Sequence, residues 1–443
     1  MTYEAVDELV VDVDRLAVYV EGWQSWSPTA WLRPGTVPLP DLEWQHTMRF
    51  RPGAPLPDDG WQAEGLLVVD PGDGQPVRTY GAPKADDDLP SVRASLVGDR
   101  LTVAGTGDLE VAESADPATA LETFGDAFAA RAGVGPLRPA PRVWCSWYRY
   151  FEALTTADVL EALDDLDTFD LPVEVVQIDD GWSRGLGEWL APTVGVPSLG
   201  DLVARIRDRG RRAGIWLAPF LVGRETALAR EHPHWLLGDA GRNWGQPLLG
   251  LDLTHPGVRE YLAESIGSLV DLGVDYFKLD FVYGGAVPGR RHEDVSPVAA
   301  YRSGLRLIRE AAGEDAYLVG CGAPVLPSVG LLDAMRVSPD TFHEGGEDGS
   351  HGLRGRPSLV ARAWQQGRFW VNDSDCLVVR PSYAQREVWA ATVAAFGGLR
   401  SCSDRFGELD DWGLATTRSL LASAPPPRPF ARDVVAVARE EAS

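Results

Sequence analysis

The sequence predicts an α/β protein, a (β/α)8 TIM barrel preceded by an N-terminal β-sandwich domain. Three observations support this fold class. Apolar strand-like runs alternate with amphipathic segments through most of the chain, and short strand-like runs separated by Pro, Gly and Asp fill its beginning. A proline-rich segment, residues 135–142, separates the two patterns. Eight alternating units fit a closed barrel better than an open sheet.

Residues 1–135 are predicted to form the sandwich together with a linker helix. The clearest strand-like runs are Leu16–Val20, Gly65–Val69, Ser91–Leu96 and Leu101–Ala104. Turn residues at this spacing are typical of an all-β sandwich. Ala, Leu and Phe then recur at helical spacing, which predicts a helix over residues 117–132.

Residues 136–410 are predicted to form the barrel. Its eight strand-like runs are Val143–Trp147, Val173–Ile178, Gly214–Ala218, Asp275–Leu279, Ala316–Gly320, Ala334–Val337, Phe369–Val371 and Ala394–Leu399. Amphipathic segments such as Leu199–Arg212 and Gly257–Leu272 lie between them. Residues 411–443 are predicted to be a helical tail, with no second β-domain.

Composition excludes several classes of protein. The net charge of −24 would repel nucleic acid. No run of eighteen apolar residues is present, so no membrane span is expected, and we expect no secretory signal. The four cysteines, at 145, 321, 376 and 402, form no CxxC pair. They predict reduced thiols in a cytoplasmic protein and no zinc-ribbon or thioredoxin-like site.

Carboxylates recur where the predicted strands end, and the chemistry of such barrels gathers at that rim. The strand ends are Asp179-Asp180-Gly-Trp182, Lys278-Leu-Asp280, Cys321, Arg336–Asp340 and Asn372–Asp375. Tryptophans at 147, 182, 216 and 370 lie among them. Aromatic rings cover the apolar faces of a pyranose, and carboxylates accept strong hydrogen bonds from its hydroxyls. A carboxylate pair can also cleave a glycosidic bond without a metal or cofactor.

One basic residue of the predicted barrel is unusual. Of the 41 Lys and Arg residues, only Lys84 and Lys278 are lysines. A lysine kept in a buried-looking strand is a candidate for a role that needs a compact ammonium group.

Each feature also has a structural interpretation. An Asp after a strand often caps a helix, although Gly181 and Trp182 make a loop after Asp180 the better prediction. Lys278 could be an ion-pair partner of Asp280, and the tryptophans could belong to the core.

The strand ends together resemble the melibiase-like glycoside hydrolases, glycoside hydrolase family 36 and its relative family 27. The matching segments are Cys145-Ser-Trp147, Gln177–Trp182, Gly214–Pro219, Asp275–Asp280 and Arg336–Asp340. The resemblance implies that Asp280 is the catalytic nucleophile and Asp340 the acid/base. In a retaining enzyme their carboxyl groups lie roughly 5–5.5 Å apart.

The resemblance also implies a set of sugar contacts. Asp179 and Asp180 would hold the axial 4-hydroxyl and the 6-hydroxyl, and Lys278 would donate to the 3- and 4-hydroxyls. Arg336 would lie near the 2-hydroxyl, and Trp216 would stack on the sugar. Two further substrate-binding positions are Trp147 and Cys321.

The implied activity is that of a retaining α-galactosidase acting on terminal α-galactosides of small molecules or oligosaccharides, through a covalent glycosyl-aspartate intermediate. A raffinose-synthase-type transglycosylase, an α-N-acetylgalactosaminidase or an α-glucosidase-like enzyme would use the same scaffold. A catalytically inactive sugar-binding barrel is the alternative from a different class. Homo-oligomerisation is left open.

One segment departs from the family pattern. The stretch after strand five is Cys321-Gly-Ala-Pro-Val-Leu-Pro327 where many members are glycine-rich, so recognition at the sugar 2-position is left open. Trp23 and Trp26, in Glu21–Pro28, are expected either to reach a barrel mouth, of their own chain or of a neighbouring subunit, or to pack within their own domain. His232-Pro-His234 has a metal-ligand spacing, but it does not end a predicted strand, which disfavours a metal-dependent hydrolase.

Overall fold

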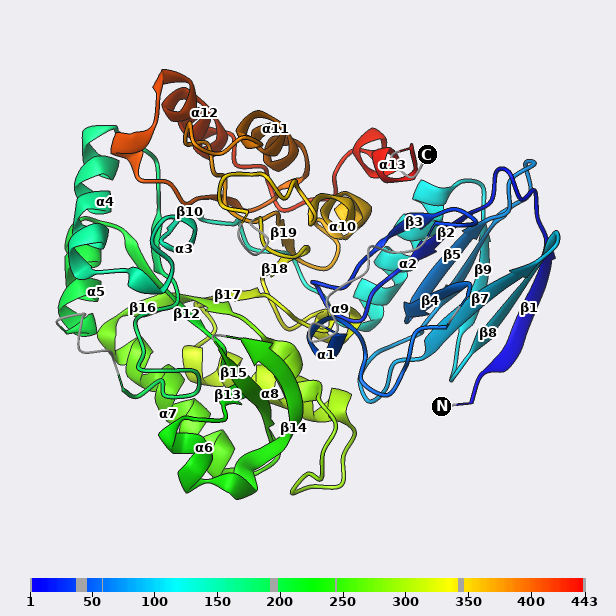
Figure 1. Ribbon diagram of the computed structural model, residues 1–443, viewed down its shortest axis with the longest axis horizontal. Coiled ribbons are helices and arrows are strands. Elements are labelled where there is room, and N and C mark those ends of the chain that lie inside the picture. Colours follow the sequence, from blue (N-terminus) through cyan, green and yellow to red (C-terminus); the bar gives the residue numbers. More distant parts are fainter. Residues whose placement is uncertain are drawn as a thin grey trace.

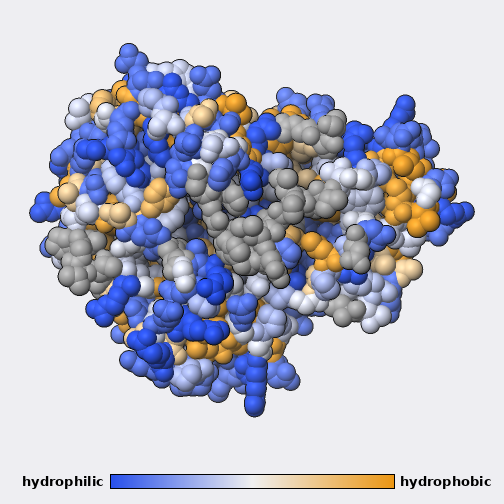
Figure 2. Space-filling view, in the orientation of Figure 1, coloured by the Kyte–Doolittle hydropathy of each residue, from blue (hydrophilic) through white to orange (hydrophobic). Residues whose placement is uncertain are grey.

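The computed structural model describes residues 2–36, 46–57, 59–191, 198–243, 245–341 and 346–440. Two antiparallel sheets lie at one end of the molecule and a barrel at the other (Figure 1). The predicted combination of barrel and sandwich is thereby confirmed. The face shown in Figure 2 is mostly hydrophilic. Across the described ranges, no helix is long and apolar enough to cross a membrane.

The N-terminal sheets have the strand orders β1-β8-β7-β4 and β3-β2-β5-β6-β9. Their strands are β1 (Glu4–Val10), β2 (Ala17–Val20), β3 (Ala30–Leu32), β4 (Trp61–Glu64), β5 (Leu66–Asp70), β6 (Val77–Gly81), β7 (Ser91–Val97), β8 (Arg100–Gly105) and β9 (Glu110–Ser114). Val18 and Val20 of β2 face the core between the sheets. The alternate residues, Ala17 and Tyr19, join the larger core shared with the barrel. The five-stranded sheet is therefore covered on both faces, which explains the continuous apolar run of β2.

Helix α2 (Pro117–Arg131) follows β9 and agrees with the predicted helix over 117–132. The Asp116 side chain caps its first turn by accepting from the Thr119 N–H, and Pro117 occupies the first helical position. Both choices are favoured at a helix start because the first N–H groups have no partner within the helix. Its buried side, which includes Leu121 and Phe128, joins the core shared with the barrel.

The eight barrel strands are parallel and follow the order β19-β18-β17-β16-β12-β11-β10-β20. They are β10 (Arg142–Cys145), β11 (Val175–Ile178), β12 (Arg212–Leu217), β16 (Val274–Leu279), β17 (Tyr317–Gly320), β18 (Ala334–Arg336), β19 (Val371–Asp373) and β20 (Arg400–Cys402). The seam between β19 and β20 is bridged just before β20. There the N–H groups of Gly398 and Leu399 donate to the Asn372 carbonyl at 2.8 and 3.0 Å.

The helices of the described chain after α2 lie mainly outside the barrel (Figure 1). They are α3 (Trp147–Tyr150), α4 (Thr156–Thr168), α5 (Leu199–Asp208), α6 (Ala227–Glu231), α7 (Pro256–Leu272), α8 (Pro297–Ala312), α9 (Val325–Ser328), α10 (Arg356–Ala361), α11 (Arg386–Phe396), α12 (Asp411–Ala422) and α13 (Arg432–Glu440). The short α1 (His46–Arg49) precedes β4. Helix α13 returns to the sandwich, where Arg439 pairs with Asp70 at 3.0 Å.

The prediction of the eighth strand was wrong. Ala394–Phe396 is the last turn of α11, and strand β20 begins only at Arg400. Alanine favours helix, and Gly397 and Gly398 then end it. A three-residue barrel strand with the sequence Arg-Ser-Cys carries no β-branched or aromatic signal, so the apolar run before it was mistaken for the strand.

An antiparallel sheet inserted after β12 was not predicted. Strands β13 (Leu221–Gly223), β14 (Leu236–Asn243) and β15 (Gln246–Leu251) form it in the order β13-β15-β14. Its register shifts twice between β14 and β15, so the pattern of alternating apolar residues is interrupted.

The segment Glu21–Pro28 reaches the barrel of its own chain. Ser25 N donates to the Ala323 carbonyl at 2.9 Å, and the Trp26 ring meets Phe281 edge to face at 4.8 Å. Arg362, which follows α10, joins the two parts in their buried interior. Its Nε donates to Glu21 Oε1 at 2.8 Å, and both side chains are 0% exposed.

We expect Arg362→Met to lower the free energy of unfolding by about 3–5 kcal/mol, because it leaves the Glu21 carboxylate buried without its cation. Urea unfolding followed by tryptophan fluorescence measures the change. The matched control is Arg405→Met, which removes the half-exposed pair with Glu161 and should cost less than about 1 kcal/mol. Equal effects of the two substitutions would contradict the importance of the buried pair.

Candidate active site

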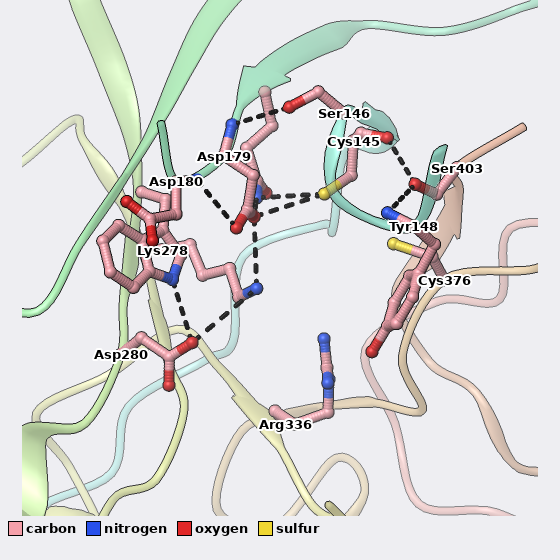
Figure 3. Close-up of polar contacts among 12 residues, drawn as sticks. Cys145, Ser146, Tyr148, Asp179, Asp180, Lys278, Asp280, Arg336, Cys376 and Ser403 are labelled. Atoms are coloured by element: carbon pink, nitrogen blue, oxygen red, sulfur yellow. Dashed lines mark hydrogen bonds and ion pairs between the residues drawn. The ribbon is translucent and has the colours of Figure 1, made fainter. Parts of the chain in front are cut away.

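Four polar side chains from three barrel strands meet at the carboxyl-terminal rim. Asp179, Lys278, Asp280 and Arg336 are 1%, 6%, 5% and 2% exposed. Figure 3 shows Asp179, Lys278 and Asp280 directed toward one another, with Arg336 on the other side of the same space. Strands β11, β16 and β18 end at this rim, so residues far apart in the sequence become neighbours.

Lys278 is the cation shared by two aspartates. Its Nζ lies 3.2 Å from Asp179 Oδ2 and 3.8 Å from Asp280 Oδ2. Burial alone would lower the pKa of this ammonium group, but the two carboxylates outweigh burial and raise the pKa well above its usual range. Lys278 therefore stays charged and balances both acids. The expected ion pair with Asp280 is present, but it is the longer of the two.

Asp280 is oriented from both of its oxygens. The Trp216 indole N–H donates to Oδ2 at 2.9 Å, and the Phe281 N–H donates to Oδ1 at 2.8 Å. Phe281 has a left-handed backbone with φ of 50°, which is unfavourable for a residue with a side chain. Such strain persists only where the surroundings enforce it. The oriented carboxylate and the strained residue together mark this strand end as a functional position.

Asp179 is held by residues of its own and the neighbouring strand. Its Oδ2 accepts from Gln177 Nε2 at 2.5 Å and from the Cys145 thiol at 3.3 Å. Its backbone N–H donates to Ser146 Oγ at 2.9 Å. These contacts fix the carboxylate beside Lys278.

Asp180 is buried without a comparable set of donors to its side chain. Burial, with added repulsion from Asp179, Glu152 and Asp280, raises its pKa to about 7, although the Gly181 N–H lowers it. The helix-cap interpretation of the aspartate pair is wrong, because the next helix, α5, begins at Leu199 and is capped by Ser198. The pair instead leads into a loop.

Arg336 spreads its guanidinium over three aspartates. Its Nη1 lies 3.0 Å from Asp340, its Nη2 lies 2.6 Å from Asp375, and its Nε lies 3.4 Å from Asp373. Burial opposes the charge, but the carboxylates of Asp375 and Asp373 outweigh it and keep Arg336 protonated. The planar fork with several N–H donors suits this arrangement, which a lysine could not reproduce.

Asp340 is the most accessible acid of the rim, with a side chain that is 43% exposed. Its pKa is nevertheless raised to about 6. Desolvation of the carboxylate by the surrounding protein is the main cause of the raised pKa. Attraction by Arg336 and Lys278 opposes it, and repulsion from Asp375 and Asp280 adds to it. A carboxyl group with this pKa can be protonated near neutral pH and can reach solvent or a ligand.

The other expected site residues lie around this centre. Trp147 begins α3, is half-buried and packs edge to face on Phe151 at 5.2 Å. Cys321 follows β17 and is fully buried. Trp216 is only 2% exposed, and its indole N–H is directed at Asp280. The tryptophans at 182, 216 and 370 are buried, in agreement with the core interpretation.

Sequence reasoning assigned no role to Tyr148, Thr341 or Asp375. The Tyr148 hydroxyl and both the N–H and the hydroxyl of Thr341 donate to Asp375. Asp375 lies in a strand end that the sequence did single out, but the contacts come from two other strand ends. No local signal reveals such a convergence.

His232 and His234 lie outside this rim. The ring of His232 stacks on Trp235 at 3.9 Å. Throughout the described part of the chain, no group of three or more His, Cys, Asp and Glu residues has the geometry of a metal site.

Comparisons with known proteins agree with the geometry. The Melibiase family model matches residues 139–300. The structure of TtGalA, an α-galactosidase from Thermus thermophilus in complex with p-nitrophenyl α-D-galactopyranoside, superposes with a TM-score of 0.75 at 30% identity. The alignment covers 97% of this chain and 94% of that one. A second structure of TtGalA, in complex with stachyose, gives 32% identity and a TM-score of 0.74, with 91% and 90% covered.

Matches to two curated relatives are shorter. The bifunctional α-galactosidase/sucrose kinase AgaSK of Mediterraneibacter gnavus is 28% identical over 148 residues, which are 31% of this chain and 15% of that protein. The α-galactosidase AgaA of Geobacillus stearothermophilus is 31% identical over 122 residues, 25% of this chain and 17% of that protein. The fold and its rim of carboxylates define a carbohydrate-active barrel enzyme. The chain belongs to the melibiase-like glycoside hydrolases.

We expect Lys278→Met to destabilise the fold in a pH-dependent way. Without the ammonium group, Asp179 and Asp280 are two buried like charges, and such a loss costs about 3–5 kcal/mol. Protonation of a carboxylate relieves the repulsion, so the loss should be smallest near about pH 4 and should grow toward neutral pH. Thermal unfolding at both pH values measures it.

Lys84→Met is the matched control, because Lys84 is the other lysine of the chain and is exposed. Its melting temperature should follow wild type at both pH values. A Lys278→Met deficit that is independent of pH would mean that Lys278 acts through packing and not through its charge.

Proposed function

We propose that the protein is a retaining α-galactosidase that hydrolyses terminal α-galactosides through a covalent galactosyl-aspartate intermediate. The main observation behind this proposal is the buried Asp280 carboxylate at the barrel rim. Trp216, the Phe281 N–H and Lys278 orient it there. TtGalA, a relative in complex with a nitrophenyl galactoside and with stachyose, supports the substrate class.

Asp280 and Asp340 have the complementary properties that the reaction requires. In the first step an Asp280 oxygen attacks the anomeric carbon, the glycosidic bond breaks, and the leaving oxygen takes the proton of Asp340. In the second step Asp340 accepts a proton from water, which attacks the anomeric carbon and releases Asp280. A pKa of about 6 allows Asp340 to serve in both roles. The two carboxyl groups supply nucleophile and proton, so the proposal requires no cofactor.

The remaining rim residues are proposed to recognise the sugar. Asp179 and Asp180 accept from the 4- and 6-hydroxyls, Lys278 donates to the 3- and 4-hydroxyls, and Arg336 lies near the 2-hydroxyl. Trp216 is proposed to orient Asp280, since its ring is almost completely buried. Trp147 and Cys321 complete the proposed set. Transfer to a second sugar and a 2-acetamido substrate remain the alternatives.

We place the protein in the cytoplasm as part of the proposal. All four cysteines are free thiols in buried positions. Unpaired buried thiols are usual in reducing compartments.

Asp280→Ala should lose nearly all hydrolysis of aryl α-galactosides while it folds normally, because the attacking oxygen is gone. Added azide should occupy the vacated space and yield the β-galactosyl azide, whose configuration NMR can establish. Asp275→Ala is the control, because Asp275 lies at the opposite end of the same strand in a partly exposed pair with Arg212. Full activity of Asp280→Ala, or an α-configured azide product, would refute the assignment.

Wild type should prefer nitrophenyl α-galactoside to the α-glucoside by on the order of 10⁴ in kcat/KM, since an equatorial 4-hydroxyl would leave buried charges unpaired. Asp179→Asn should slow the galactoside more than the glucoside and so reduce that ratio. If both substrates slow equally, Asp179 does not select the configuration at C4. A wild type that favours glucoside would overturn the substrate assignment itself.

A further inference from the structure

Asp375 is a fully buried acid in an unfavourable backbone conformation. It follows β19, is 0% exposed and has φ of 82°, in the left-handed region that favours glycine. A non-glycine residue persists there only when its contacts outweigh the strain. The contacts of Asp375 therefore indicate what the conformation serves.

Both carboxylate oxygens of Asp375 accept hydrogen bonds from neighbouring groups. Oδ2 accepts from the Thr341 N–H and hydroxyl, each at 2.7 Å, and from the Tyr148 hydroxyl. Oδ1 accepts from the Cys376 N–H at 2.7 Å and pairs with Arg336 Nη2 at 2.6 Å. All of these partners are hydrogen-bond donors, so both oxygens of the Asp375 carboxyl group are used as acceptors.

Two of these contacts lead directly to Asp340. Thr341 is the next residue in the chain, so Asp375 fixes the backbone immediately after Asp340. Arg336 donates through Nη1 to Asp340 Oδ1 at 3.0 Å while it pairs with Asp375 through Nη2. Asp375 thus positions Asp340 in two ways: it fixes the backbone at Thr341, and it holds Arg336, which pairs with the Asp340 carboxyl group.

The charges around Asp340 act in opposite directions. The charged or titratable groups that face it in the described structure are Arg336 on β18, Asp375 after β19, Lys278 and Asp280 at the end of β16, Cys321 after β17 and Tyr148 on α3. An arginine so close would by itself stabilise the carboxylate and remove the proton that an acid needs. Asp375 pairs with the other Nη nitrogen of the same guanidinium and offsets its charge.

Resting on the proposed function, we propose that Asp375 is a positioning residue for the acid/base Asp340. It anchors Thr341 and neutralises Arg336, so that Arg336 orients Asp340 without depriving it of its proton. Asp375 contacts no substrate in this proposal, and its entire effect passes through Asp340 and Arg336.

Asp375→Asn removes the charge with little change in shape. In wild type the basic limb of the kcat/KM profile should fall near pH 6, the pKa of Asp340. In the variant the limb should move down by about 1–3 pH units, because Arg336 is no longer offset. At neutral pH, raffinose hydrolysis should fall by about 10²-fold or more, whereas an aryl galactoside with a good leaving group needs little protonation and should change far less.

Tyr148→Phe is the matched control, since it removes a hydroxyl that donates to Asp375 and accepts from the Thr341 N–H, but keeps the Asp375–Arg336 pair. Its basic limb should stay at the wild-type pH. Arg336→Gln is the second variant and should move the limb upward, because Asp375 and Asp280 then act on Asp340 without the opposing guanidinium. The opposite shifts keep the proposal testable if Asp375→Asn does not fold.

Basic limbs that remain at the wild-type pH in both Asp375→Asn and Arg336→Gln would overturn the proposal. Equal rate losses for all leaving groups at every pH would also overturn it, because that is the signature of a merely structural residue. A wild type without activity on α-galactosides would instead refute the proposed function, and the two failures are thereby distinguishable.

Discussion

The rim of the barrel removes several carboxylates from water, and the rest of the site depends on two cations that make their burial tolerable. An isolated buried carboxylate costs several kcal/mol. Lys278 offsets part of the charge of Asp179 and Asp280, and Arg336 pairs with Asp340, Asp373 and Asp375. The site is thus two charge clusters side by side, one around the proposed nucleophile and one around the proposed acid/base.

The two cations differ in a way that suits their clusters. The ammonium of Lys278 is a compact charge that lies between two carboxylate oxygens, whereas each nitrogen of the Arg336 guanidinium faces a different aspartate. The lysine therefore acts as a point charge and imposes no fixed direction on either neighbour, and other donors orient the two carboxylates. The arginine fixes the directions of three groups at once. This difference explains why a lysine persists at position 278 in a chain whose basic residues are otherwise almost all arginines.

The sequence was informative wherever a feature is local. Seven of the barrel strands overlap their predicted ranges, because a buried parallel strand is a short apolar run. The strand ends Asp179-Asp180 and Lys278-Leu-Asp280 were visible for the same reason. Strand β20 was missed because its three residues carry no apolar pattern, and the β13–β15 sheet because its register shifts interrupt the alternation. The link from Asp375 to Thr341 and Tyr148 joins three strand ends, and only the closed barrel brings these together.

The N-terminal sandwich is part of the support for this rim. Segment Glu21–Pro28 lies on the barrel beside Gly322, which has a left-handed backbone. Because Gly322 has no Cβ, it leaves room for the Trp26 ring. Trp26 in turn packs on Phe281, the strained residue that follows Asp280 and donates to its carboxylate. The buried Glu21–Arg362 pair holds the base of that segment. The strain at Phe281 is therefore sustained by contacts from the sandwich as well as from the barrel, which gives the smaller domain a direct part in orienting the proposed nucleophile.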